Sequence, residues 1–256
     1  MLPPRSAVLS PWPAMLLTAG LGTRLAPLSD LKAKPALPVA GVPLAGRILR
    51  WLAGGGVADA VLNLHHRPET VTAAVGDGRA FGVRVRYSWE PRVLGSAGGP
   101  ARALPLLDAD RFFLVNGDTL TDLDLAALAA SHTASGAAVT LAVVPNPDPL
   151  HYGGVSVDED GCVRGFAAPG PGNRGWHFIG VQAVNASVFA ALDPQEPAGR
   201  DSRVHVPGVV LRHRHRGRLP RDVPGRRPRR GPGRRARRRP RRHRPGRARH
   251  PFRAVG

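Results

Sequence analysis

The chain has 256 residues, of which 42% are hydrophobic and 21% are charged. This length is enough for one substantial α/β core and allows one or two domains. The formal net charge of +19 comes entirely from residues 201–256, which contain 21 arginines, no lysine and two acidic residues. Residues 1–200 hold 16 basic and 16 acidic side chains, so the basic balance of the whole chain indicates nothing about the function of that part.

The composition argues against a membrane protein and against a disulfide-rich secreted protein. No stretch approaches the roughly 18 consecutive apolar residues that a membrane-spanning helix needs. The single cysteine, Cys162, excludes an internal disulfide framework and is typical of a reducing compartment. We therefore expect a cytoplasmic protein with no membrane partner.

Residues 1–14 are interpreted as an N-terminal extension. They contain four prolines and no apolar run long enough for a signal peptide. The natural start is either Met1 or Met15, and the folded domain is predicted to cover residues 15–200 and to be truncated at its C-terminal end.

A short apolar strand then leads into a glycine-broken turn with two cations. The run 15–17 is typical of a buried parallel strand, and Gly20 and Gly22 let the backbone approach a ligand without a Cβ atom in the way. Arg24 can bind phosphate oxygens through two parallel hydrogen bonds, Lys34 adds a second charge, and exposed N–H groups in such a turn bind anions. The segment is therefore predicted to hold a polyphosphate, although its spacing matches neither the Walker loop nor the dinucleotide-binding motif. The alternative is a surface turn with two exposed cations.

Strands and helices alternate through the next hundred residues. This alternation predicts a parallel sheet with covering helices, in which ligands bind beyond the carboxyl ends of the strands. The expected helices are 44–52, 68–75 and 100–107, and the expected strands are 59–64, 83–87 and 112–115. From residue 137 the pattern changes to strands 137–144 and 176–185 around a hairpin that turns at 158–161.

Two polar groups follow strands of this predicted sheet. Asp118 comes directly after the strand 112–115 and Asn116, and a single carboxylate is a sufficient protein ligand for Mg²⁺ when phosphate oxygens supply the rest. The alternative for Asp118 is a turn or capping residue, which is the expectation for Asp122 and Asp124 before the helix that runs through residue 128. The pair at 65–66 is expected to pack in a loop, because two histidines without spaced partners make a poor metal site.

The arginine-rich segment 201–256 has three interpretations. A basic arm could bind nucleic acid or an acidic membrane surface, because clustered arginines neutralise phosphates. Only Phe252 could stack on a base, and the segment has no apolar periodicity, so it is expected to be disordered. We favour a third interpretation, a GC-rich gene translated out of frame, which the coding DNA would test by restoring a strand-rich sequence in another frame.

The run at 19–41, AGLGTRLAPLSDLKAKPALPVAG, closely resembles the signature of the sugar-1-phosphate nucleotidylyltransferases, GxGTRLxPLT followed by KPxLPV. The resemblance implies an α/β fold with a Rossmann-like, doubly wound mixed sheet of the nucleotide-diphospho-sugar transferase type. It also implies that a nucleoside triphosphate reacts with a sugar 1-phosphate, assisted by Mg²⁺, to give a nucleotide sugar and pyrophosphate.

The resemblance implies a role for each matched residue. Arg24 would hold the β- and γ-phosphates, Lys34 would lie near the α-phosphate, and Asp118 would hold Mg²⁺. The anion-binding turn would comprise Ala19, Gly20, Leu21, Gly22 and Thr23. The run 94–104, LGSAGGPARAL, resembles the family loop that contacts the base and its sugar, here through Gly95, Ser96, Gly98 and Gly99, with Asn116 nearby. The backbone at Gly153, Gly154 and Gly180 would approach the sugar ring.

Two parts of the family pattern are absent. A Glu-Lys-Pro run, whose lysine binds the sugar phosphate, is replaced by FAAPG at 166–170, which leaves Arg164 or Arg174 as substitutes. The second metal-binding aspartate has no counterpart except Asp222, which lies in the arginine-rich segment. The sequence is most similar to a short bacterial branch, so the predicted activity is that of a mannose-1-phosphate guanylyltransferase acting on GTP. The alternatives are an N-acetylmuramate-1-phosphate uridylyltransferase acting on UTP, a nucleotide-binding pseudoenzyme, and an arginine-tailed nucleic-acid binder.

Overall fold

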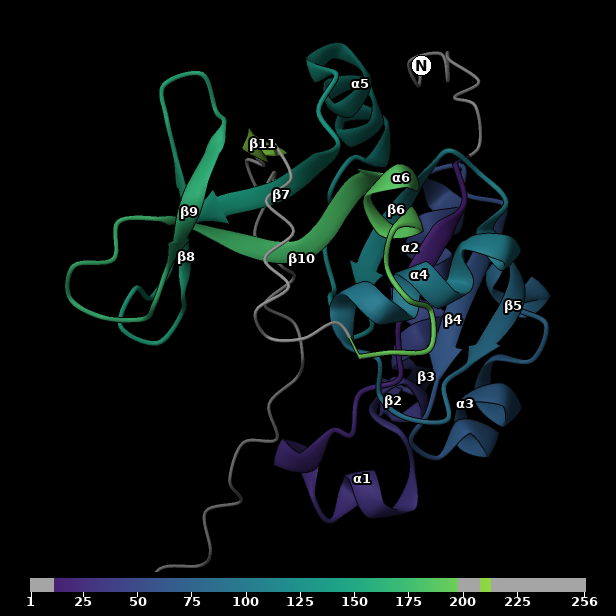
Figure 1. Cartoon of the computed structure of the whole chain (residues 1–256). Helices are drawn as coiled ribbons and strands as arrows, with labels where there is room; N and C mark the ends of the chain where they lie inside the picture. The colour runs from purple at the N-terminus through teal and green to yellow at the C-terminus, as the bar shows by residue number, and fades with distance from the viewer. Residues whose placement is uncertain (1–11, 198–207, 213–256) are drawn as a thin grey trace, which may run out of the picture. The chain divides into compact units, whose positions relative to one another are not determined.

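The structure of the chain is a computed structural model that describes residues 12–197 and 208–212 (Figure 1). The described residues form a nine-stranded sheet in the order β11-β7-β10-β6-β1-β4-β5, with β8 paired to β10 and β9 paired to β8. The strands of this sheet are β1 (Ala14–Leu17), β4 (Asp59–Leu64), β5 (Arg84–Trp89), β6 (Arg111–Asn116), β7 (Val139–Pro145), β8 (Gly154–Val157), β9 (Val163–Ala167), β10 (Trp176–Asn185) and β11 (Gly208–Arg212). A separate two-stranded ribbon pairs β2 (Pro38–Val39) with β3 (Val42–Pro43).

The sheet is mixed, as predicted. β1 runs parallel to both β4 and β6, and β4 runs parallel to β5. β10 lies between β6 and β7 and runs antiparallel to both, so the strand direction reverses at this point of the sheet. Helical crossovers between the parallel strands make this a doubly wound α/β fold, which confirms the predicted fold class.

Helices cover both faces of the sheet because successive side chains of a strand point to opposite faces. In β1, Leu16 packs in the cluster that includes α2, α3 and α5, whereas Met15 packs in the cluster with α4 and α6. β6 divides in the same way, with Phe113 in the first cluster and Phe112 in the second. The helices are α1 (Leu28–Leu31), α2 (Leu44–Gly54), α3 (Pro68–Val75), α4 (Gly95–Leu107), α5 (Leu125–Ser135) and α6 (Ser187–Ala190), with 3-10 turns η1 (Thr23–Leu25), η2 (Lys34–Ala36) and η3 (Arg79–Phe81).

Most helices and strands lie close to the ranges predicted from the sequence. Asp124 is the N-cap of α5, as predicted, and accepts hydrogen bonds from Ala126 N and Ala127 N at 2.9 and 3.2 Å. The main difference is α4, which begins at Gly95 and not at Pro100. The expected glycine loop is therefore the first turns of a helix. Gly98 and Gly99 are buried there, so tertiary packing overrides the low helix propensity of glycine.

The two ends of the domain also differ from the expected boundaries. β1 begins at Ala14, and Trp12 packs against the rings of Phe113 and His132 at centroid distances of 5.4 and 5.6 Å. β11 pairs in parallel with β7 over all five of its residues, so the expectation of disorder is wrong for this part of the basic segment. The remainder of that segment, including Asp222, lies outside the described residues. No helix of the described part is long and apolar enough to cross a bilayer.

Candidate functional site

The loops that follow β1 and β6 lie side by side at the carboxyl ends of these two parallel strands. Leu17 is paired with Asn116, and Gly117 N donates a hydrogen bond to Leu17 O at 3.0 Å. A Cβ atom at Gly117 would overlap the Leu17 carbonyl and would lie 3.1 Å from Thr18 Cγ2. Glycine at this position therefore lets the second loop pack against the first.

Lys34 and Asp118, which are 84 residues apart in the sequence, form a hydrogen-bonded ion pair between Nζ and Oδ2. Lys34 begins η2, whose other two residues, Pro35 and Ala36, are buried and anchor the turn. The side chains of the pair remain 31% and 45% exposed, so both are accessible to a ligand. The structure thus brings the predicted phosphate-binding cation and the predicted metal ligand to one place.

The predicted anion-binding turn folds back against this ion pair. Gly22 has a φ of 65°, and a Cβ atom there would lie 3.5 Å from Ser29 Cβ and 3.6 Å from Lys34 Cβ. Arg24 is exposed in η1 and has no hydrogen bond or ion pair with another described residue, so its guanidinium is available to a ligand. The remaining residues of the turn are Ala19, which is buried, and Gly20, Leu21 and Thr23, which are exposed.

The second glycine cluster divides into a surface part and a packing part. Gly95 and Ser96 are exposed in the first turn of α4, whereas Gly98 and Gly99 are buried. A Cβ atom at Gly99 would lie 2.8 Å from Glu90 Oε1, so glycine is needed there for packing. Gly95 and Ser96 remain the residues of this cluster that can contact a nucleotide.

The predicted sugar-binding glycines are of two kinds. Gly180 has a φ of 81° and lies against the site, because a Cβ atom there would overlap Thr119 Oγ1 and would lie 2.8 Å from Asn116 Nδ2. Gly153 and Gly154 belong to the end of the sheet that carries β8 and β9. A Cβ atom at Gly154 would overlap Asn173 Oδ1, so glycine there serves packing within that region.

The two arginines considered as substitutes for the missing lysine have different surroundings. Arg164 Nε donates a hydrogen bond to Asp158 Oδ2 at 2.8 Å, and the NH2 nitrogen of Arg164 forms an ion pair with the same oxygen at 2.6 Å. The pKa of Asp158 lies below its ordinary value, mainly because Cys162 N donates a hydrogen bond to its carboxylate and also because Arg164 pairs with it. Arg164 therefore stabilises the hairpin, whereas Arg174 is exposed and without a polar partner among the described residues.

A buried polar network beneath the site was not predicted. Asn63, at 3% exposure, accepts a hydrogen bond from Thr18 N at 2.6 Å and donates one to Glu90 at 2.7 Å. Glu90, at 0% exposure, also accepts a hydrogen bond from Leu94 N at 2.9 Å. Nothing in the local sequence distinguishes this glutamate from a surface residue, because its burial depends on three segments that meet only in the fold.

The histidine pair has the packing role that was expected. His66 Nε2 lies 2.8 Å from Ser29 O and holds the segment that follows the anion-binding turn. His65 Nδ1 lies 2.9 Å from Glu90 O and holds the segment that enters α4. The two rings therefore position loops on both sides of the site.

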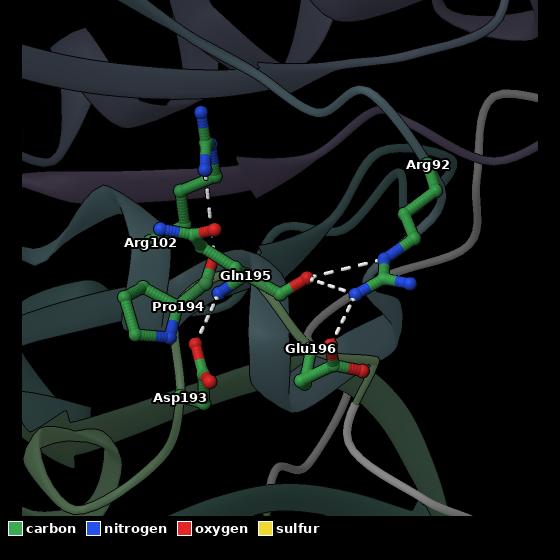
Figure 2. A network of polar contacts seen from close by, with 6 residues as sticks. All are labelled: Arg92, Arg102, Asp193, Pro194, Gln195 and Glu196. Atoms are coloured by element: carbon green, nitrogen blue, oxygen red, sulfur yellow. Dashed lines mark hydrogen bonds and ion pairs between the residues drawn. The ribbon is translucent and has the colours of Figure 1, made fainter.

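The segment after α6 is fastened to the loop between β5 and α4 (Figure 2). Arg92 donates from Nε and from NH2 to Gln195 O at 3.1 and 2.7 Å, and its NH2 nitrogen lies 2.6 Å from Glu196 Oε1. Arg102 donates to Trp89 O at 2.6 Å and to Pro194 O at 3.5 Å. The loop that carries Glu90 is thus held from the outside by two arginines.

Asp118 is the carboxylate of this site that could hold a divalent cation, because its side chain is 45% exposed. The described residues contain no group of three or more His, Cys, Asp or Glu side chains placed to hold a metal ion. Mg²⁺ suits such a sparse site, because it keeps several waters and binds through one or two carboxylates together with substrate phosphates. Asp118 Oδ2 is paired with Lys34, so a cation would bind through Oδ1 or replace Lys34 at Oδ2.

Comparison with known proteins gives consistent matches. The family model for nucleotidyl transferases matches residues 13–168. N-acetylmuramate alpha-1-phosphate uridylyltransferase of Neisseria meningitidis is 39% identical over 183 residues, which cover 70% of this chain and 78% of that protein. Mannose-1-phosphate guanylyltransferase of Mycobacterium tuberculosis is 38% identical over 153 residues, which cover 60% of this chain and 43% of that protein.

Solved structures show the same fold. HddC from Yersinia pseudotuberculosis has a TM-score of 0.70 at 22% identity, covering 78% of this chain and 90% of that one. A structure from Bacillus anthracis, solved in complex with sucrose, has a TM-score of 0.69 at 17% identity, covering 79% of this chain and 87% of that one.

Proposed function

This chain belongs to the nucleotidyl transferase family, and from that premise we propose that it joins a nucleoside triphosphate to a sugar 1-phosphate, giving a nucleotide sugar and pyrophosphate. The family predicted from residues 19–41 is confirmed. The observation that carries the proposal is the pairing of Lys34 with Asp118 beside the anion-binding turn. A site with a free cation, a paired cation and an accessible carboxylate suits a polyphosphate and its counter-ion.

The proposed reaction needs positioning and charge neutralisation more than protein nucleophiles. An oxygen of the sugar phosphate attacks the α-phosphorus in line, the bond to the bridging oxygen breaks, and the β- and γ-phosphates leave as pyrophosphate. Arg24, which is exposed and unpaired among the described residues, would bind the departing phosphates. Lys34 would move from Asp118 to the α-phosphate.

We propose Mg²⁺ as the cofactor, held by Asp118. When bound, this ion neutralises phosphate charge and orients phosphate oxygens. For the acceptor phosphate we infer Arg174, since Arg164 is engaged by Asp158.

For the substrates, two pairs have support of different kinds. The uridylyltransferase of Neisseria meningitidis shares the larger part of its own length with this chain, 78%, which favours UTP and N-acetylmuramate 1-phosphate. The guanylyltransferase of Mycobacterium tuberculosis is almost equally identical, at 38%, over the part that the two chains share, which keeps GTP and mannose 1-phosphate as the second candidate.

A substrate panel tests the proposal. The purified chain is incubated with Mg²⁺, with GTP or UTP, and with mannose, glucose or N-acetylmuramate 1-phosphate, and pyrophosphate release is measured. We expect release to depend on one nucleotide and one sugar phosphate together. Nucleotide binding without release from any pair would contradict the proposal and indicate a nucleotide-binding protein without transferase activity.

A further inference from the structure

We propose that Glu90 is a positioning residue of the nucleotide site, which holds the two glycine-bearing segments at a fixed separation without touching the ligand. This inference rests on the proposed function, because it concerns the site of the same nucleoside triphosphate. Glu90 directly follows β5 and precedes the loop that enters α4. It is 0% exposed, so its carboxylate does not reach the surface on which a nucleotide would lie.

The carboxylate is held by N–H donors and not by a cation. Asn63 Nδ2 donates to Oε1 at 2.7 Å, and Leu94 N donates to Oε2 at 2.9 Å. No ion pair joins Glu90 to another described residue. Burial of a charged group is costly unless its hydrogen bonds are maintained, so the positions of both donors are tightly specified.

From Glu90 the network continues to the start of the anion-binding turn. Asn63 Oδ1 accepts a hydrogen bond from Thr18 N at 2.6 Å, and Asn63 O accepts one from Thr18 Oγ1. Thr18 immediately precedes that turn, and Leu94 immediately precedes α4. One buried carboxylate therefore links the loop after β1, the end of β4 and the first turn of α4.

Packing closes the network. A Cβ atom at Gly99 would lie 2.8 Å from Glu90 Oε1 and 2.9 Å from Asn63 Nδ2, so α4 lies directly over both polar groups. The hydrogen bond from Arg102 Nε to Trp89 O, at 2.6 Å, holds the residue that directly precedes Glu90. The loop is thus held on both sides of Glu90.

The network needs two acceptor oxygens at position 90. In Glu90→Gln only one oxygen remains, and the new NH2 group faces either Asn63 Nδ2 or Leu94 N, which are both donors. An unsatisfied buried N–H is enough to shift an equilibrium by about tenfold. We expect the lost hydrogen bond to displace the loops that form the nucleotide site and so to weaken nucleotide binding.

The test uses the full chain in four forms: the wild type, Glu90→Gln, Asn63→Asp and the double variant. In the double variant the carboxylate moves to position 63, where one oxygen accepts from Thr18 N and the other accepts from the new amide. The amide oxygen at position 90 then accepts from Leu94 N. Every hydrogen bond of the network is restored at unchanged net charge.

Dissociation constants for GTP and UTP are measured by calorimetry, together with KM, kcat and thermal unfolding. Glu90→Gln should raise the Kd and KM of the nucleotide about tenfold while kcat at saturation stays within about threefold. The Asn63→Asp variant should bind the nucleotide more weakly still, because it places two carboxylates face to face. The double variant should return to within about threefold of the wild-type Kd.

A buried hydrogen-bonded group away from the site provides the control. His132 bonds to Thr140 Oγ1 and Asn185 Oδ1 at 2.9 and 3.0 Å. His132→Gln should lower the unfolding temperature and leave the nucleotide KM unchanged, which separates a general loss of stability from a displaced site.

A wild-type Kd in Glu90→Gln would overturn the inference. So would a double variant that binds as weakly as Glu90→Gln, because the carboxylate would then contact the nucleotide itself. If the single variants fail to fold, the double variant decides, and it must fold and bind nucleotide as the wild type does. A wild-type protein that binds neither nucleotide would refute the proposed function instead.

Discussion

Replacing Asp118 by asparagine should abolish most turnover with little effect on folding. The change removes one charge and keeps the size of the side chain. Its partner Lys34 is 31% exposed and Asp118 is 45% exposed, and exposed ion pairs of this kind contribute about 0.2–1 kcal/mol to the free energy of unfolding. For a domain of about 150–250 residues, a loss of 1 kcal/mol lowers Tm by only about 2–4 °C.

The expected loss of activity is much larger. Removing one group that stabilises developing charge lowers kcat by about 100- to 1,000-fold, equivalent to about 2.7–4 kcal/mol. The assay is pyrophosphate release at saturating substrates, with thermal unfolding measured on the same samples. Asp124→Asn is the matched control, because it makes the same change of charge in the same loop between β6 and α5 while asparagine still caps α5. Turnover within twofold of the wild type, or a loss that simply follows unfolding, would refute the reasoning.

Three further outcomes are expected. Arg24→Ala should lower kcat and leave Tm within about 1 °C of the wild type, because the exposed guanidinium has no partner among the described residues; unchanged kinetics would contradict this role. Gly180→Ala should lower the free energy of unfolding by at least about 1 kcal/mol in denaturant titrations, because φ is 81° and the new methyl group would overlap Thr119 Oγ1; an unchanged midpoint would disagree. Burial lowers the pKa of His132, so below about pH 6.5 the unfolded chain takes up a proton that the folded chain does not. The free energy of unfolding should therefore decrease as the pH is lowered through this range, by at most about 1.4 kcal/mol per pH unit. His132→Gln should lack this pH dependence, and an equal dependence in the variant would assign it to other groups.

The sequence predicted the parts of the site that depend on local order. Arg24, Lys34 and Asp118 follow apolar strands or glycine-broken turns, and those patterns are visible within about twenty residues of each position. The N-cap at Asp124 was predicted for the same reason, because capping is a local hydrogen bond. These residue types and spacings determine the family and the topology of the core.

Other features could not be predicted, because long-range packing decides them. α4 begins five residues earlier than its composition suggests, since Leu94 N is bonded to a buried carboxylate and Gly99 must pack over Glu90. The strand β11 forms inside a segment whose composition predicts disorder. Its five residues pair with β7 and so gain hydrogen bonds that an isolated segment lacks.

The sequence by itself predicted the parts of the candidate site: a glycine-broken turn, two cations and one carboxylate at the carboxyl ends of parallel strands. Only the tertiary structure decided that Lys34 and Asp118 meet, and that Glu90 lies beneath both glycine-bearing segments. The physical reason is distance along the chain. A local pattern records which side chains are available, whereas contacts across 84 residues depend on the sheet register and on the glycines that allow two loops to approach.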